Sequence, residues 1–382
     1  MKWMSVISFA LLVGTLSGCV DDSFGGAPSD DNTSSDEPVP VFVEIGDPTQ
    51  VKGVGAVDNM ALEDGRSIYV YAFNSNMLTS FRYTAYQDEV NTLLDGSVDF
   101  PQSRLGRRAI TNSRGDVLQW PDATQTFCYH DGDLKHIPYE FYAYYVDDIN
   151  VRNIDVIRED DAVRLNLEID GSQDLMSAKA EGAYNYDTGL EGVNPRFYFK
   201  HHLVKLDFEL VPGFVAGGSQ SVIVESIEVD SKYKGIFTVA EKSRPSQQGI
   251  DFPGTACKAL TLKGPRGVPM REYELSTLES QTEIPKAIQV DGSLLVAPQK
   301  DSLVAYVTMK QIREDGSVEA KARTQVSLKY SKGDGYGSFD AGNRYKVKFQ
   351  VYGITTVKTM VTVEPWLSGG NASIDTEDKP EI

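Results

Sequence analysis

The chain of 382 residues contains few of the side chains that most often carry out chemistry in proteins. Four histidines and three cysteines leave little material for metal binding or nucleophilic catalysis. No H-E-x-x-H, C-x-x-C, G-x-S-x-G or phosphate-loop pattern occurs anywhere in the sequence. We therefore expect no catalytic, cofactor-binding or metal site, and we expect that the chain is not an enzyme.

The few candidate ligands support that expectation. One cluster, "CYHDGDLKH", contains Cys128, His130, Asp131, Asp133 and His136. Zinc sites usually take ligand pairs from two places, and the second pair is missing, so we interpret the cluster as a polar turn. His201 and His202 begin an alternating segment in which we expect one side chain inward and one outward, both structural because no carboxylate or nucleophile partner is identifiable.

Positive charge is also scarce, with 37 Lys and Arg against 55 Asp and Glu and a formal net charge of -18. This balance argues against a nucleic-acid partner and against an anionic membrane surface. Besides Cys19, only Cys128 and Cys257 remain, and one long-range bridge would not form a disulfide framework. We expect two buried thiols that are not bonded to each other, with a disulfide as the alternative.

Long hydrophobic runs are limited to the start of the chain. Lys2 precedes an apolar stretch at residues 6–13, which is too short for a stable membrane span and is typical of a secretory leader. The sequence Leu-Ser-Gly at residues 16–18 is followed directly by Cys19, as bacterial lipoprotein processing requires. We predict a signal peptide at residues 1–18, a lipid on Cys19, a location at the cell surface as an outer-membrane lipoprotein, and a flexible linker at residues 19–40.

The rest of the chain is dominated by alternation of apolar and polar residues. Residues 163–169, 203–210, 324–330 and 344–353 alternate, whereas residues 67–73 and 139–146 are apolar on both faces. These patterns predict strands with one or two buried faces, and so an all-β sandwich fold. Short helices are expected at residues 101–110 and 273–280, and "GDGYG" at residues 333–337 is interpreted as a hairpin connection.

The length of the chain favours two domains. A polar segment at residues 170–195 separates two halves that each contain several strands. We predict an N-terminal β-sandwich domain at residues 41–195, a C-terminal β-sandwich domain at residues 196–370, and a polar tail at residues 371–382.

Several landmarks occur in order along the chain. They are "FYAYYVDD" (141–148), "DLMSA" (174–178), "FKHHLVKLDFEL" (199–210), "LLVAPQ" (294–299), "FDAGNRYKVKFQVYG" (339–353) and "VEPW" (363–366). Together they resemble the fimbrillin family of Bacteroidetes, the subunits and accessory proteins of type V pili. The resemblance implies two tandem transthyretin-like β-sandwiches with a few short helices. It also implies export as a lipoprotein, removal of the first strand by a trypsin-like protease, and insertion of a strand from a neighbouring subunit.

Mapped onto this sequence, the resemblance implies a removable strand formed by Val41, Phe42, Val43, Glu44 and Ile45. Candidate processing sites are Lys52 and Arg66. Gln50 stands about where stalk subunits of the family have an arginine, so a subunit that keeps its first strand and remains a lipid-linked anchor is an open alternative. The polar tail is a poor donor strand, and residues 356–366 are the better candidate.

These observations predict a structural or adhesive subunit of cell-surface fimbriae. Its expected partners are other pilus subunits, the outer membrane through the lipid on Cys19, and a processing protease. The alternative is a permanently lipid-anchored surface protein that binds glycans, since the chain has 19 tyrosines and 3 tryptophans. Most of these aromatic residues fall within strand patterns, which favours core packing.

Overall fold

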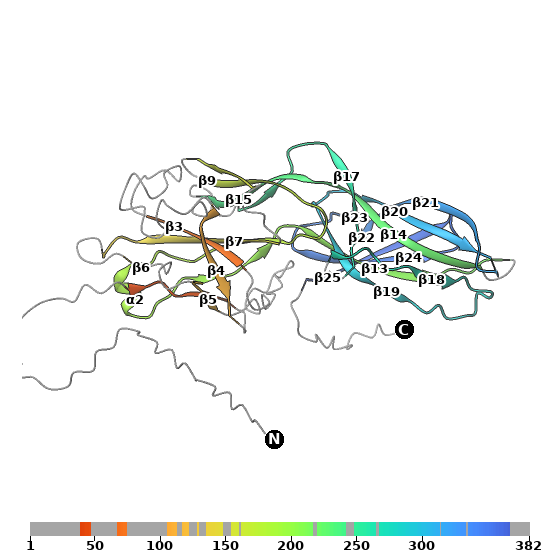
Figure 1. Ribbon diagram of the computed structural model, residues 1–382, viewed down its shortest axis with the longest axis horizontal. Coiled ribbons are helices and arrows are strands. Elements are labelled where there is room, and N and C mark those ends of the chain that lie inside the picture. Colours follow the sequence, from red (N-terminus) through yellow and green to blue (C-terminus); the bar gives the residue numbers. More distant parts are fainter. Residues whose placement is uncertain are drawn as a thin grey trace, which may run out of the picture. The chain divides into compact units, whose positions relative to one another are not determined.

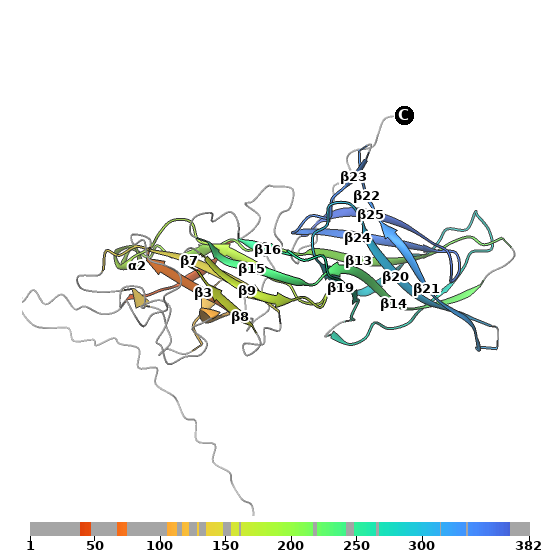
Figure 2. The same cartoon turned by 90° about the horizontal axis from the view of Figure 1, so that it is seen from above.

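The computed structural model describes residues 39–46, 67–74, 105–112, 117–121, 128–129, 135–147, 154–159, 162–216, 220–241, 248–264, 267–313, 315–333 and 335–366. All of them belong to the unit Glu37–Ile382. Strands account for nearly every element in these ranges, so the all-β prediction is confirmed (Figures 1 and 2). Cys19, Lys52 and Arg66 lie outside the described residues.

The first sheet has eight strands. In spatial order they are β11 (Arg196–Phe197), β2 (Val43–Ile45), β5 (Val117–Gln119), β4 (Arg107–Thr111), β3 (Ser67–Asn74), β7 (Tyr139–Val146), β10 (Leu175–Lys179) and β12 (Lys200–His201). In a flat sheet of eight strands the two edge strands would lie about 34 Å apart. However, the edge strand β11 ends at Phe197 and the other edge strand, β12, begins at Lys200, and three residue steps span only about 11 Å. The sheet must therefore curl until its edges β11 and β12 come close together.

The curled sheet encloses a core of its own. Its members include Val43 of β2, Val70 of β3, Phe141 of β7, Met176 of β10 and Phe197 of β11. The opposite face packs against a four-stranded sheet with the order β16 (Gly249–Asp251), β15 (Lys234–Glu241), β9 (Ala162–Glu168) and β8 (Asp155–Arg158). Tyr144 of β7 meets Phe237 of β15 edge to face at 6.2 Å. The two sheets together form a sandwich.

A second pair of sheets is built from the later strands. The six-stranded sheet has the order β19 (Ile288–Val296), β13 (Val204–Pro212), β24 (Asn343–Val351), β25 (Val357–Pro365), β22 (Tyr330–Lys332) and β23 (Gly335–Gly337). The five-stranded sheet contains β17 (Cys257–Thr261), β14 (Ser221–Lys232), β20 (Leu303–Ile312) and β21 (Val318–Leu328), with β18 (Tyr273–Ser276) paired to β14. Buried and half-buried residues alternate along most of β14 and β24, with one break in β14 at the register shift between Val224 and Ser226, and the buried ones form the core between these sheets.

Two small elements complete the described residues. The short strand β1 (Val39–Pro40) pairs with β6 (Cys128–Tyr129). The helix α2 (Tyr186–Leu190) begins at Asn185, whose side chain accepts a hydrogen bond from the backbone N–H of Thr188. β22 and β23 form an antiparallel pair, so residues 335–337 are a strand and not part of a connection. The hairpin interpretation is therefore wrong in its extent, and β21 and β24 on either side of the segment belong to different sheets.

Both expected helices are wrong in the described residues. Residues 107–111 form β4, because Gly106 breaks the local chain direction with a φ of 88°, β3 offers a partner for Ala109, and β5 offers one for Thr111. Residues 273–276 form β18, in which Tyr273 and Leu275 face the core and the residues between them are exposed. In both segments the available strand partner outweighed the local preference.

The division of the chain into domains at residue 195 remains a prediction. Strand pairing associates β11 and β12, which follow that point, with the first sheet. The hairpin β15–β16 returns to pair with β9. Strands from both sides of residue 195 therefore build the first sandwich.

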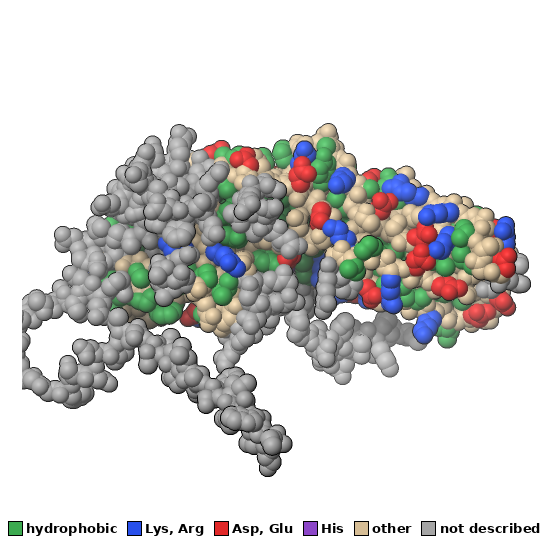
Figure 3. Space-filling model, in the orientation of Figure 1, with side chains coloured by type: hydrophobic (Ala, Val, Ile, Leu, Met, Phe, Trp, Pro, Cys, Tyr) green, Lys and Arg blue, Asp and Glu red, His purple; other side chains and the backbone are tan. Residues whose placement is uncertain are grey.

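On the face of the molecule that Figure 3 shows, the acidic side chains are not gathered in one patch. Figure 3 shows acidic and basic side chains interspersed over the later strands. Ion pairs include Arg323 of β21 with Glu228 of β14 at 2.8 Å, and Lys310 of β20 with Glu272, just before β18, at 2.8 Å. Mixed charges of this kind favour solubility.

Candidate functional site

The N-terminal strand segment, residues 41–45, lies inside the eight-stranded sheet rather than at its edge. Its strand β2 pairs antiparallel with β5, with Val43 opposite Leu118, and parallel with β11, with Glu44 opposite Arg196. The backbone N–H of Glu44 donates to the carbonyl of Pro195 at 2.9 Å, and that of Gly46 donates to the carbonyl of Phe197 at 2.8 Å. This short segment thus satisfies backbone groups of two neighbouring strands.

Alternation along the segment separates its side chains into two sets. Val41 and Val43 are fully buried and Ile45 is 8% exposed, and all three belong to the core within the curled sheet. Phe42 points the other way and is 58% exposed. Each buried aliphatic side chain contributes about 1.5–3 kcal/mol relative to an exposed one. The side chains of Val41, Val43 and Ile45 therefore occupy three apolar pockets of the core, which we call slots.

Polar contacts hold the segment from both sides. On one side the indole Nε1 of Trp120 donates to the carbonyl of Val41 at 2.9 Å. On the other side the guanidinium of Arg196 donates through Nε to Glu44 at 2.9 Å, and this hydrogen bond raises the pKa of Arg196. A Cβ on Gly46 would lie 2.3 Å from the ring of Tyr198, so Gly46 lets this tyrosine close over the end of the segment.

Sequence reasoning identified the segment but missed the residues that hold it. Trp120 and Arg196 are 79 and 152 positions from their partners in the segment. The only local pattern is the alternation of residues 196–200, in which Phe197 and Phe199 are buried and their neighbours are not. Pairings over such distances follow from the topology and not from any nearby residue.

The expected donor region, residues 356–366, is itself part of a sheet. β25 pairs with β24 along its whole length, from Val357 opposite Val351 to Pro365 opposite Asn343. Trp366 follows and is 3% exposed, with its ring stacked on His201 at 3.8 Å. In this structure the region is thus held by its own chain.

The two adjacent histidines are both buried, which corrects the expectation of one inward and one outward side chain. β12 ends at His201, so the strand alternation does not extend to His202. Both also have the partners that the sequence did not reveal. The Nδ1 atom of His201 lies 2.8 Å from a carboxylate oxygen of Asp174, and the Nε2 atom of His202 lies 2.7 Å from the hydroxyl of Ser177.

This histidine cluster does not have the geometry of a nucleophile and its base. The carboxylate contacts one histidine and the serine contacts the other, so no Ser-His-Asp chain is formed. Ser177 is 2% exposed and out of reach of a substrate. Burial together with the nearby His201 lowers the pKa of His202 to about 4, so its ring is neutral near neutral pH.

The possible metal cluster is only partly described. His130, Asp131 and Asp133 lie outside the described residues. His136 is exposed and its Nδ1 lies 2.7 Å from Asp187. Within the described ranges, no group of three or more histidine, cysteine or acidic side chains could hold a metal ion.

The two later cysteines are not bonded to each other. Cys128 is half-buried in β6, and Cys257 is exposed at the start of β17. The expectation that both thiols are buried is therefore wrong for Cys257. Burial raises the pKa of the Cys128 thiol.

Among the residues that the structure describes, no helix is long and apolar enough to cross a membrane.

No curated protein matches the chain. Several solved structures do. A candidate cell adhesion protein from Bacteroides ovatus is 12% identical with a TM-score of 0.38, and the match covers 87% of this chain and 99% of that one. A similar protein from Bacteroides eggerthii is 10% identical with a TM-score of 0.39, over 87% and 98% of the two chains.

The fimbrial anchor protein Mfa2 from Porphyromonas gingivalis also matches. It is 9% identical with a TM-score of 0.29, over 86% of this chain and 98% of that one. The family model described as fimbrillin-like matches residues 56–366, which include every described strand from β3 to β25. The chain belongs to the fimbrillin-like family.

Proposed function

We propose that this protein is a fimbrial subunit that is exported as a lipoprotein on Cys19 and assembled by strand exchange. In the proposal the N-terminal strand segment fills the groove between β5 and β11 in the precursor. Cleavage at Lys52 or Arg66 releases it, and a strand from another subunit takes its place. Membership in the fimbrillin-like family supports a fimbrial or adhesive role at the cell surface.

One observation carries the strand-exchange proposal. A short segment near the start of the chain lies between two strands, with Val41, Val43 and Ile45 in the core. Its removal would leave the edges of β5 and β11 without a partner and would open three apolar slots. Unpaired strand edges readily accept another chain, and alternate slots select its side chains.

The C-terminal strand of a second copy fits this groove by its sequence pattern. Residues 41–44 read V-F-V-E and residues 361–364 read V-T-V-E. In β25, Val361 is buried, and Glu364 lies on the opposite face, 3.4 Å from Lys346. A donated β25 would then place Val361 and Val363 in the slots of Val41 and Val43, and Glu364 beside Arg196.

N-terminal sequencing of the protein recovered from cells tests the proposal. We expect a new terminus at Gly53 or Ser67, together with polymers seen by electron microscopy. The double variant Lys52→Gln and Arg66→Gln should keep the original terminus and form no polymers. Lys300→Gln, at an exposed position, is the matched control and should behave like the parent chain.

Two results would contradict parts of this proposal. A blocked, acylated Cys19 in the surface form, with no shorter product, would indicate an anchor that retains its first strand. Polymers that form equally well from the uncleaved double variant would exclude proteolysis as the trigger.

A further inference from the structure

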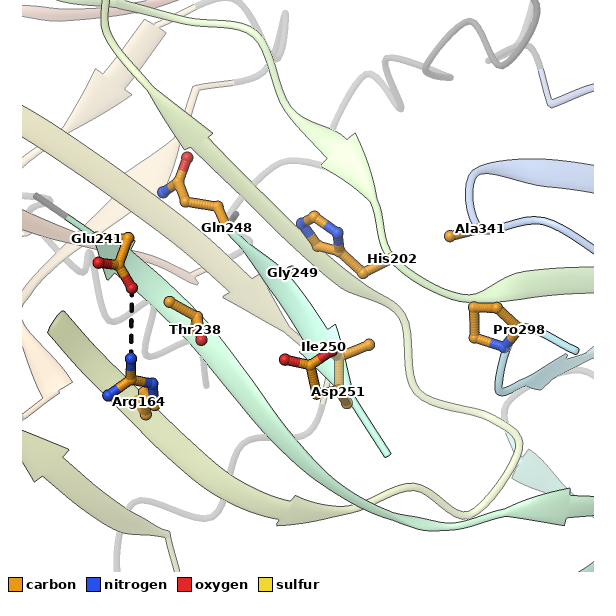
Figure 4. A pocket seen from close by; sticks show the side chains of 10 residues that line it. All are labelled: Arg164, His202, Thr238, Glu241, Gln248, Gly249, Ile250, Asp251, Pro298 and Ala341. Atoms are coloured by element: carbon orange, nitrogen blue, oxygen red, sulfur yellow. Dashed lines mark hydrogen bonds and ion pairs between the residues drawn. The ribbon is translucent and has the colours of Figure 1, made fainter. Parts of the chain in front are cut away.

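A polar cavity of about 530 Å³ lies beside the hairpin β15–β16. Figure 4 shows the side chains that line it, most of them from β9, β15 and β16. They are Arg164, His202, Thr238, Glu241, Gln248, Gly249, Ile250, Asp251, Pro298 and Ala341. The cavity shares no lining residue with the groove of the N-terminal strand segment.

Two buried polar groups in the lining have unused hydrogen-bonding capacity. Thr238 is 5% exposed, and its hydroxyl has no hydrogen-bond partner among the described residues. His202 is 8% exposed and uses Nε2 for Ser177. Its Nδ1 has no partner in the described part of the chain. This atom lies 3.3 Å from the point where any other residue at position 249 would place its Cβ, so Gly249 leaves the space next to Nδ1 empty. Neither the hydroxyl of Thr238 nor Nδ1 of His202 is among the described side-chain atoms that are fully buried without a partner, so both face the open space of the cavity, where water or a bound molecule can reach them.

The charged groups of the lining are largely neutralised within the protein. Arg164 pairs with the buried Glu241 at 3.3 Å, and it also contacts Glu159. Asp251 is exposed and adds one carboxylate. An anionic ligand would meet these acidic groups, and a cationic one would find Glu241 already paired. The carboxylate of Asp251 is exposed, so solvent screens its attraction for a cation. Complementarity therefore favours a neutral ligand.

The remaining groups favour a ligand that both donates and accepts hydrogen bonds. A threonine hydroxyl can do both, a neutral imidazole nitrogen does one or the other according to its tautomer, and carboxylates accept. Gln248 is fixed by donating from its amide nitrogen to the carbonyl of Val239 at 2.7 Å. The apolar contribution comes only from Ile250, Pro298 and Ala341, so a hydrophobic ligand would gain little.

We propose that this cavity binds a neutral saccharide unit, with the hydroxyl of Thr238, Nδ1 of His202 and the carboxylate of Asp251 bonding to its hydroxyl groups. The absence of an aromatic side chain from the lining removes ring stacking as a source of affinity. Binding should therefore be weak, with a Kd on the order of 1 mM. The site does not depend on strand exchange, since it lies in the cleaved and the uncleaved chain alike.

Saturation-transfer difference NMR on the purified chain tests the proposal, with glucose, galactose, mannose, N-acetylglucosamine, lactose and maltose as probes at millimolar concentration. We expect a signal from at least one sugar. Thr238→Val should weaken its binding about three- to tenfold, which corresponds to one lost hydrogen bond. Thr308→Val on β20 is the matched control and should leave binding unchanged.

The same variants report whether the fold survives. Thr238→Val should not lower the melting temperature, because the hydroxyl that it removes has no partner in the described chain. Asp251→Asn should weaken the binding of a neutral sugar only slightly. The same substitution would greatly weaken the binding of a cationic ligand, because it removes a negative charge. The proposal is overturned if none of the six sugars gives a signal, or if Thr238→Val binds as tightly as the parent chain.

Discussion

The imidazole of His202 is held in surroundings that disfavour a positive charge. Burial is the largest cause, and the nearby His201 and Lys200 act in the same direction, against the carboxylate of Asp174. Together they lower its pKa from 6.5 to about 4. The neutral ring is therefore the form that packs against Phe237 at 5.4 Å.

This buried ring should make the stability of the protein depend on pH. Between pH 6.5 and pH 4 the unfolded chain binds a proton at His202 that the folded chain rejects, so the free energy of unfolding falls as the pH falls. The loss should reach about 3 kcal/mol at pH 4. Urea unfolding at pH 7 and pH 4 measures it, and His202→Gln should show a smaller loss. His136→Gln, at an exposed position, is the control; equal losses in both variants would contradict the assignment.

The pair of histidines also shows what a sequence pattern can and cannot predict. The expectation that both histidines begin the alternating strand at residues 203–210 is wrong, because His201 ends β12 in the first sheet and β13 begins only at Val204. The partners Asp174 and Ser177 come from β10 and its approach, some 25 positions earlier in the chain. Contacts of this kind depend on which strands become neighbours in the sheet.

At the scale of single elements, the parallel pair β13 and β24 lies in the interior of the six-stranded sheet, between β19 and β25. Phe208 and Phe349 are both fully buried and stack with 5.7 Å between ring centroids and 6° between planes. Phe208→Ala should lower the free energy of unfolding by about 3–5 kcal/mol, because it removes a large side chain from a packed core. Denaturant unfolding checks this value. Tyr336→Ala, at a side chain 67% exposed, should change it far less.

The strands β13 and β24 could be predicted because each alternates over many residues. Both overlap the segments expected to be strands, residues 203–210 and 344–353, to within two residues at each end. The failures were short segments. β4 and β18 carry too few residues for a period of two to stand out, and the strand that each pairs with decides their conformation.

The strand β2 is another short element, and a single side chain helps to hold it. Trp120→Phe keeps an aromatic ring, although a smaller one, but removes the hydrogen bond to the carbonyl of Val41, whose loss should cost about 0.5–1.5 kcal/mol. The N-terminal strand segment should then open more often. Hydrogen exchange at the amides of Glu44 and Gly46 should quicken, while the amides of β24 keep their rates. Unchanged exchange at both positions would show that the indole does not hold the segment.

At the scale of the whole molecule, the proposed assembly requires two forms of the protein, one with the N-terminal strand segment in place and one without it. In the described form the groove between β5 and β11 is full, and β25 is paired with its own neighbour β24. Neither the groove nor the C-terminal strand is then open to another copy. That the segment at residues 41–45 is removable stays a prediction from the family resemblance. No pattern in the sequence indicated that Trp120 and Arg196 hold this segment in place.

Deleting residues 1–46 should convert this closed form into one that associates. The edges of β5 and β11 and the slots of Val41, Val43 and Ile45 would be exposed, and pairing with another chain would cover them again. Sedimentation should show a monomer for the chain that begins at Cys19 with Cys19→Ser, and larger species for the deletion variant. A synthetic peptide of residues 39–46 should return the deletion variant to a monomer by refilling the groove. The same peptide with Val41→Asp and Val43→Asp should fail, because two carboxylates cannot enter apolar slots without a large desolvation cost. If the folded deletion variant stays monomeric and binds neither peptide, the groove is not an assembly site.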